Sequence, residues 1–273
     1  MKQVIFQNKK IFYRAEGSGN PIMLLHGFAE DHTIWDYQVE KLKNDFLVIL
    51  PDIPGSGASK MLQGNISIAD YAEVIKSIAD AEGVTPRKKP FTLIGHSMGG
   101  YITLAFAEKY PELLNGIGLF HSSAYADDET KIAARKKGIE FIKSKGAESF
   151  LRTTTPNLFA EKTKQENPVL IEKLISLSKN ISPEALIQYY EAMMKRPDRS
   201  SILKSFPKPV LYIVGKQDNA VPLTLSLKQC HLSPIFQINI LQDSGHVGMW
   251  EEKDLASECI KSFLEKTINY CND

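Results

Sequence analysis

The stretch Gly95-His96-Ser97-Met98-Gly99 decides the fold of this chain, because it stands between a strand-like and a helix-like segment. Residues 90–94 before it are mainly apolar and predict a short buried strand, and residues 101–109 after it are good helix formers. A serine between a strand and a helix, with glycine two residues away on either side, is the pattern of a nucleophile elbow. Such a turn is too tight for larger flanking side chains, and it strains the serine backbone while exposing the hydroxyl group.

Length and composition describe a globular chain with no special partner surface. The 273 residues suit one large domain or two small ones, and a net charge of +1 predicts no nucleic-acid partner. No apolar run is long enough for an integral membrane span, and the N-terminal apolar stretch is too short for a signal peptide. We therefore expect a cytoplasmic protein, either a monomer or a homodimer.

The three cysteines, Cys230, Cys259 and Cys271, are too few and too widely spaced to form a metal or redox pair. We expect reduced structural or surface thiols, no metal site and no cofactor.

Strand and helix patterns alternate along most of the chain. Strand-like segments occupy residues 4–6, 11–13, 22–25, 46–50, 90–94, 114–120, 209–215 and 235–241. Helical patterns stand between them at residues 33–43, from the N-cap Ser67 to Gly83, 101–109, 223–230 and 255–268. The alternation predicts an α/β fold with a mostly parallel sheet of about eight strands and helices on both faces.

Between residues 122 and 206 the sequence has helical patterns, at 129–145, 168–179 and 183–195, and no strand pattern. We therefore expect a core formed by residues 1–121 and 207–273, and a helical cap formed by residues 122–206. Sites in such sheets lie at the carboxyl ends of the strands, where the insertion begins, so the cap is expected to act as a lid.

A serine hydroxyl needs a base to take its proton and a third group to orient that base. Among six histidines, His246 is the preferred base, because it follows the last strand and so reaches the edge of the elbow. Asp218 follows the preceding strand and is the preferred acid, whereas Asp243 would have to fold back from the loop of His246. The predicted catalytic order is Ser97, Asp218, His246, which differs from both protease orders.

The remaining histidines receive structural interpretations. His96, next to Ser97 on a sharp turn, is expected to point away from the site and pack behind it. His26 is expected to brace a loop by hydrogen bonding, and His32 and His231 to be structural. His121 ends a strand, so it is also a candidate for the pocket.

An oxyanion needs donors that are already in place. The backbone N–H of Met98, directly after the serine, is the first candidate. The N–H of Phe28 is the second, since Gly27 before it permits a close turn.

Over nearly its whole length the chain resembles the α/β-hydrolase-fold family. The resemblance rests on motifs in the family's order: His26-Gly27-Phe28, Asp52-x-x-Gly55-x-Gly57-x-Ser59, Gly95-His96-Ser97-Met98-Gly99-Gly100, Gly215-x-x-Asp218 and Gly245-His246. It implies a serine triad, and it implies that Asp52 braces a loop near the site. The serine at the elbow differs from the aspartate of haloalkane dehalogenases and epoxide hydrolases. The stretch after His26 is neither the HGGG type of some lipases nor the form seen in proline iminopeptidases.

Aromatic and methionine side chains in the lid and near the site loops could line an apolar substrate pocket. The candidates are Trp35, His121, Tyr125, Phe141, Tyr190, Met194 and Met249. The competing interpretation is that such residues pack the lid helices together, and residue by residue it is favoured. The charged runs 127–131 and 135–137 are interpreted as a solvated helix face, so no arginine pair implies a carboxylated or phosphorylated substrate.

The leading prediction is a serine hydrolase that cleaves a small-molecule ester, lactone or thioester through an acyl-enzyme. Relatives with the same triad cleave carbon–carbon bonds, act as lyases or use peracids, and a comparison of diketo acids with simple esters would separate them. A third hypothesis is that the chain is a ligand-binding or signalling protein on a hydrolase scaffold. Tight binding without turnover would support it.

Overall fold

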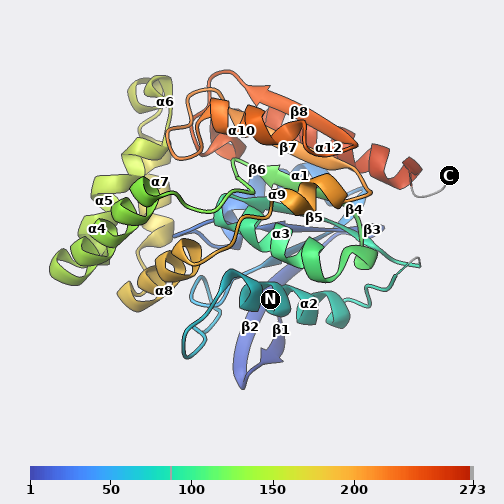
Figure 1. The fold of residues 1–273 in the computed structure, drawn as a ribbon, viewed down its shortest axis with the longest axis horizontal. Helices are drawn as coiled ribbons and strands as arrows, with labels where there is room; N and C mark the ends of the chain where they lie inside the picture. Colours follow the sequence, from blue (N-terminus) through green and yellow to red (C-terminus); the bar gives the residue numbers. More distant parts are fainter. Residues whose placement is uncertain (87, 271–273) are drawn as a thin grey trace.

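The computed structural model describes residues 1–86 and 88–270, with one mixed sheet of eight strands in the order β1-β2-β4-β3-β5-β6-β7-β8 (Figure 1). Only the pairs β1–β2 and β2–β4 are antiparallel. The strands are β1 (Lys2–Phe6), β2 (Lys9–Glu16), β3 (Asn20–Leu25), β4 (Phe46–Pro51), β5 (Phe91–His96), β6 (Leu114–Phe120), β7 (Val210–Gly215) and β8 (Phe236–Leu241). The predicted fold class, a mostly parallel sheet of about eight strands, is confirmed.

Helices of the core cover both faces of the sheet. They are α1 (Asp36–Leu42), α2 (Ile68–Ala81), α3 (Met98–Lys109), α10 (Leu223–Cys230), α11 (Gly248–Glu251) and α12 (Lys253–Tyr270). Short 3-10 turns are η1 (His32–Trp35), η2 (Pro111–Leu113) and η3 (Thr155–Leu158). Ser67 is the N-cap of helix α2, and its hydroxyl and the Asp70 carboxylate form a reciprocal capping box.

The central strands are buried on both faces, which explains their unbroken apolar sequences. Adjacent residues of β3 show this: Leu25 packs with α2 and α3 in one core, whereas Leu24 packs with α1 and α12 in the other. Because side chains alternate along a strand, each central strand contributes to both cores.

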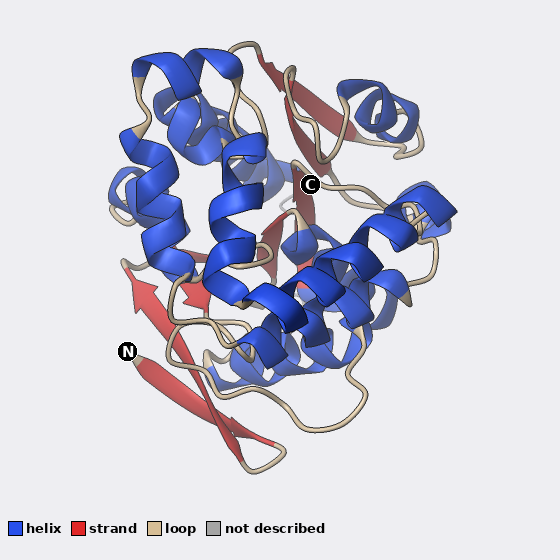
Figure 2. Cartoon of the chain, turned by 90° about the vertical axis from the view of Figure 1, so that its left-hand side faces the viewer, coloured by secondary structure: helices blue, strands red, loops and turns tan. Residues whose placement is uncertain are grey.

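A helical insert separates β6 from β7. It consists of α4 (Glu129–Lys145), α5 (Ala147–Thr154), α6 (Glu161–Glu166), α7 (Val169–Ser178), α8 (Pro183–Met194) and α9 (Ser200–Ser205). Helices α4 to α8 gather at the left of Figure 1, and Figure 2 looks onto that side. The insert contacts the loops at the carboxyl ends of the strands: the Tyr189 hydroxyl donates to Pro54 O, and His246 N donates to Leu158 O. The insert is as expected, and the domain bounds at 122 and 206 stay a prediction.

Most predicted elements are confirmed within a few residues, and the segments missed are short. Helices α5, α6, α9 and α11 have four to eight residues each, too few for a clear helical period. Cys230 and Cys259 are buried free thiols, and Cys271 lies outside the described residues.

Candidate active site

Ser97 lies in a strained turn between β5 and α3, as its sequence predicts. Its backbone has φ +50° and ψ −114°, a conformation that costs energy for a residue with a side chain. A Cβ atom on Gly95 would lie 2.1 Å from the Gly99 carbonyl carbon, and one on Gly99 would lie 2.7 Å from His26 O. Both glycines are therefore required by close backbone contacts.

A continuous chain of hydrogen bonds joins three residues from three loops. His246 Nε2 lies 2.9 Å from Ser97 Oγ, and His246 Nδ1 lies 2.8 Å from Asp218 Oδ2. Each residue directly follows or lies just beyond a strand end, β5, β7 or β8, so the parallel sheet brings them to one edge. The structure thus brings together the three residues proposed for the triad from the sequence.

The groups around Asp218 favour its ionised form. Burial would raise the pKa of Asp218, but His246 and the hydrogen bonds outweigh burial and hold it far below its usual value. The other oxygen, Oδ1, accepts from Ala220 N at 2.8 Å and Val221 N at 2.9 Å. For His246, burial would lower the pKa, and the Asp218 charge reverses this and raises it.

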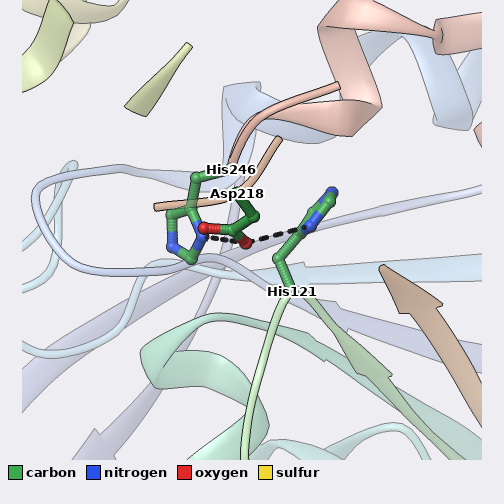
Figure 3. Close-up of side chains that lie close together, drawn as sticks. All are labelled: His121, Asp218 and His246. Atoms are coloured by element: carbon green, nitrogen blue, oxygen red, sulfur yellow. Dashed lines mark hydrogen bonds and ion pairs between the residues drawn. The ribbon is translucent and has the colours of Figure 1, made fainter. Parts of the chain in front are cut away.

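His121 lies on the opposite side of Asp218 from His246 (Figure 3). Its Nδ1 atom is 3.3 Å from Asp218 Oδ2 and accepts a hydrogen bond from Gly215 N at 3.0 Å. Burial lowers the pKa of His121 to about 4, so the ring is neutral at pH 7. The expectation that His121 lines the pocket is wrong: its ring is fully buried behind the triad.

His121, Asp218 and His246 are also the one group of three among the described residues whose ligand atoms lie within 4.8 Å of one another. The nitrogen atoms that face Asp218 are already engaged. His246 Nδ1 bonds to the carboxylate, and the lone pair of His121 Nδ1 accepts from Gly215 N. The hydrogen bonds from His246 to Asp218 and from Gly215 to His121 therefore occupy these atoms, and the absence of a metal stays a prediction.

Glu30 is a buried carboxylate that the sequence analysis did not select. Its Oε2 atom accepts from Gly27 N at 2.6 Å and lies 2.9 Å from His96 Nδ1. His96 Nε2 in turn lies 2.9 Å from His246 O. His96 is therefore packed behind the site, as expected, and it is held by Glu30 and the His246 carbonyl. The available signal for Glu30 was a charged residue five positions after an apolar strand.

The loop after β3 passes directly over the serine. A Cβ atom on Gly27 would lie 2.9 Å from His96 Nδ1 and 3.1 Å from Ser97 Cβ, so any larger residue would push these neighbours apart. Among the described residues, no hydrogen-bond acceptor pairs with the N–H of the next residue, Phe28. Met98 begins α3, where the first N–H groups have no partner within the helix.

Two other sequence assignments are settled by side-chain geometry. Asp52 braces its loop, as the resemblance implied: it accepts from Ala58 N at 2.9 Å and pairs with His32 Nδ1 at 2.7 Å. Asp243, the rival acid, is half exposed and pairs with Lys162 at 2.7 Å. It therefore does not face His246.

A cavity of about 150 Å³ adjoins Ser97 and His246. Its other lining residues are Phe28, Glu30, Tyr101, Arg135, Leu158, Tyr190, Met193, Ala220 and Val221. A second cavity of about 450 Å³ shares Arg135, Tyr190 and Ala220 with it. A hollow of about 520 Å³ beside Trp250 involves neither Ser97 nor His246.

Most pocket residues expected from the sequence lie elsewhere. Tyr190 lines the inner cavity and Phe141 the outer one, but Tyr125 lines a separate hollow. Trp35 and Met249 are wrong as pocket residues, because both are fully buried in the core beside α1 and α12. Met194 lines neither the inner nor the outer cavity, whereas Met193, one residue earlier in α8, lines the inner cavity beside Ser97.

Comparison with known proteins is consistent with this geometry. Residues 20–253 match the model of the α/β hydrolase fold family. The chain belongs to this family. It is similar to the structure of a thermophilic esterase from Thermogutta terrifontis, with a TM-score of 0.91, 28% identity, and coverage of 98% of this chain and 99% of that one.

Two curated relatives match over most of their length. Pyrrolizixenacetamide deacetylase from Xenorhabdus hominickii is 25% identical, covering 97% of this chain and 98% of the relative. A 2-hydroxy-6-oxononadienedioate/2-hydroxy-6-oxononatrienedioate hydrolase from Escherichia coli (strain K12 / DH10B) is 26% identical, covering 94% and 91%. The names of these relatives give different substrates, so the family leaves the substrate of this chain open. Across residues 1–86 and 88–270, no helix is both long and apolar enough to cross a membrane.

Proposed function

We propose that this protein is a serine hydrolase that cleaves a small-molecule ester, lactone or thioester through an acyl-enzyme intermediate. The observation that carries the proposal is the unbroken hydrogen-bond chain from Ser97 Oγ through His246 to Asp218, with Ser97 in a strained elbow. This arrangement matches the geometric requirement for an activated serine: a base within hydrogen-bond reach and an acid that orients the base.

In the proposed reaction, Ser97 Oγ bonds to the substrate carbonyl carbon while His246 Nε2 takes the hydroxyl proton. The carbonyl electron pair moves to oxygen and forms a tetrahedral oxyanion. When the oxyanion collapses, the bond to the leaving alcohol or thiol breaks, and His246 returns the proton to that group. A water molecule then attacks the acyl-Ser97 ester in the same way and releases the carboxylic acid. Asp218 stabilises the imidazolium form of His246 throughout.

We assign the oxyanion hole to the N–H groups of Phe28 and Met98. The close approach of Gly27 to Ser97 and the position of Met98 at the start of α3 support this assignment. Each donor of this kind is worth roughly 10²–10³ in rate. The helix N-terminus adds a favourable field for the developing negative charge.

The cap, residues 122–206, is proposed to act as a lid over a core formed by residues 1–121 and 207–273. The inner cavity of about 150 Å³ is small compared with ligand pockets of roughly 300–1,000 Å³. We therefore expect a short acyl group beside Ser97. The larger outer cavity would receive the rest of the molecule.

The test is hydrolysis of p-nitrophenyl esters from acetate to palmitate by the wild type and the Ser97→Ala variant. Rates should be highest for acetate to butyrate and fall by at least 10³-fold in the variant, because loss of the nucleophile of a serine triad costs about 10⁶-fold in kcat. Ser149→Ala, at an exposed lid serine, is the matched control and should behave as the wild type. Ester hydrolysis by Ser97→Ala at the wild-type rate would refute the proposal.

A carbon–carbon hydrolase with the same triad is the second candidate, because the Escherichia coli relative is named as a hydrolase of 2-hydroxy-6-oxo diacids. A vinylogous diketo acid assayed beside the esters separates the two. Turnover of the diketo acid alone would favour the second candidate.

A further inference from the structure

The charged run 135–137 was expected to lie on a solvated helix face. For Arg135 of α4 this expectation is wrong. Its side chain is only 17% exposed and lines both the inner cavity beside Ser97 and the outer cavity. A cation at this place is energetically costly unless something holds it there. The contacts of Arg135 show which group holds the guanidinium and which of its N–H donors are not used.

One edge of the Arg135 guanidinium is fully used. Nε donates to Asp127 Oδ2 at 2.6 Å, and Nη2 donates to Asp127 Oδ1 at 3.3 Å. A guanidinium carries five N–H donors, so both N–H groups of Nη1 and one of Nη2 are not used by Asp127. Among the described residues, no hydrogen bond engages Nη1, and this atom retains exposed surface.

Asp127 does not neutralise Arg135 completely, because it also pairs with Arg196 Nη1 at 2.8 Å. Two guanidinium groups thus share one buried carboxylate. Arg196 is committed to the lid structure, since it also donates to Met193 O at 2.8 Å and Tyr125 O at 2.9 Å. Two positive charges thus face one negative charge, and the uncompensated positive charge lies on the side of Arg135 that faces the cavities.

The stacked rings of Tyr190 and Phe28 lie between the Arg135 guanidinium and the proposed oxyanion hole. The Arg135 guanidinium carbon lies 5.5 Å from the centre of the Tyr190 ring, which stacks on Phe28 at 4.4 Å. Burial raises the pKa of Tyr190 to about 12, so this tyrosine brings no negative charge. The remaining carboxylate of the inner cavity, Glu30, is held by Gly27 and His96.

The outer cavity adds further positive charge. Lys131 and Lys137 line it together with Arg135, and no acidic residue does so among the described residues. Such a cavity raises the local concentration of anions.

We propose that Arg135 binds a carboxylate group of the substrate, so that the protein acts on a small ester, lactone or thioester that carries an acid function close to the scissile carbonyl. The inference rests on the proposed function of Ser97. A carboxylate is the group that fits best, because it is planar and pairs with two parallel N–H groups of a guanidinium. The size of the shared inner cavity requires both groups to belong to one compact molecule.

The test compares the monomethyl esters of malonic, succinic and glutaric acid with the neutral methyl esters of the corresponding half-amides. For at least one chain length, the wild type should show kcat/KM at least 10-fold higher for the acid than for the amide. In Arg135→Met, this ratio should fall by about 30-fold, the order expected for a lost hydrogen bond to a charged group. Arg135→Lys should restore part of it.

Arg152→Met is the matched control, because Arg152 is a lid arginine that is 55% exposed and pairs with Glu148. It should keep the wild-type ratio. The Arg135 variant is expected to fold, since Asp127 keeps Arg196 as its partner. Circular dichroism checks this.

A binding measurement makes the test independent of turnover. Calorimetric titration of monomethyl succinate into Ser97→Ala protein should show binding that Arg135→Met removes and Arg152→Met keeps. An acid-to-amide ratio of kcat/KM near one for all three chain lengths, together with no Arg135-dependent binding, would overturn the inference. In that case, Ser97-dependent hydrolysis of the methyl esters of the half-amides would still support the proposed function. Hydrolysis that survives in Ser97→Ala would overturn both.

Discussion

Glu30 Oε2 lies 2.9 Å from His96 Nδ1, and the same oxygen accepts the N–H of Gly27 at 2.6 Å. His96 continues the connection, because its Nε2 lies 2.9 Å from the carbonyl oxygen of His246. A carbonyl oxygen only accepts, so His96 Nε2 must carry a proton. This buried acid therefore joins the loop of the proposed oxyanion donor, the elbow and the loop of the proposed base.

We predict that Glu30→Ala lowers the free energy of unfolding by about 3 kcal/mol, because it leaves His96 and Gly27 N without their buried acceptor. The loops of Phe28 and His246 would lose their common anchor, so kcat should fall more than KM rises. Urea denaturation and ester kinetics measure the two effects. Glu148→Ala, at a 70% exposed carboxylate, is the control and should change stability by less than about 0.5 kcal/mol. Equal stability of the two variants would contradict this role of Glu30.

The pH dependence of hydrolysis should report the Asp218–His246 pair. His246 must be neutral to act as the base, and the Asp218 charge, opposing burial, raises its pKa above the ordinary value of 6.5. In the wild type, kcat/KM should therefore rise with pH through a pKa above 6.5. Asp218→Asn removes the charge, so the plateau should fall by about 10⁴-fold and the acid limb should move to lower pH. An acid limb that stays in place would show that Asp218 does not set the pKa of His246.

His121 should make the protein sensitive to mild acid. Burial lowers its pKa from 6.5 to about 4, so between these values the unfolded chain binds a proton that the folded protein does not. Stability from this group is present above pH 6.5 and is lost, by about 3 kcal/mol, as the pH falls toward 4. His121→Asn keeps an acceptor for Gly215 N but cannot titrate. Unfolding free energies measured from pH 7 to 4 should fall less steeply in this variant, and parallel curves would contradict the prediction.

Gly95→Ala should prevent assembly of the elbow, since the new Cβ atom would lie 2.1 Å from a backbone carbon of Gly99. We expect little soluble protein and no ester hydrolysis. Gly64→Ala is the comparison: its φ of +91° is strained for alanine, but no atom lies within 4 Å of the new Cβ. That variant should stay active and lose about 1 kcal/mol of stability. A soluble, active Gly95→Ala protein would show that the turn is less tight than the structure indicates.

The fold and the positions of Ser97, Asp218 and His246 could be predicted from the sequence because their signals are local. Each residue follows an apolar strand, and parallel strands place their carboxyl ends at one edge. The pocket could not be predicted, because it depends on which face of a helix meets the core. Met193 rather than Met194 faces Ser97, although both fit the pattern of α8.

Side-chain partners that no local pattern reveals account for the remaining differences. Arg135 belongs to a charged run of exposed appearance, yet Asp127 holds it at the cavity while also pairing with Arg196. Trp35 follows a site loop, but it packs against Phe120 on the core side, with ring centres 5.4 Å apart.

The most direct test of the central claim is mass spectrometry of the protein after reaction with a fluorophosphonate, which phosphonylates activated serines. The account predicts that one adduct forms on the intact wild type, that peptide mapping places it on Ser97, and that Asp218→Asn slows its formation. Labelling of another serine, or labelling of Ser97 that is equally fast without Asp218, would contradict the claim that this hydrogen-bonded chain activates Ser97.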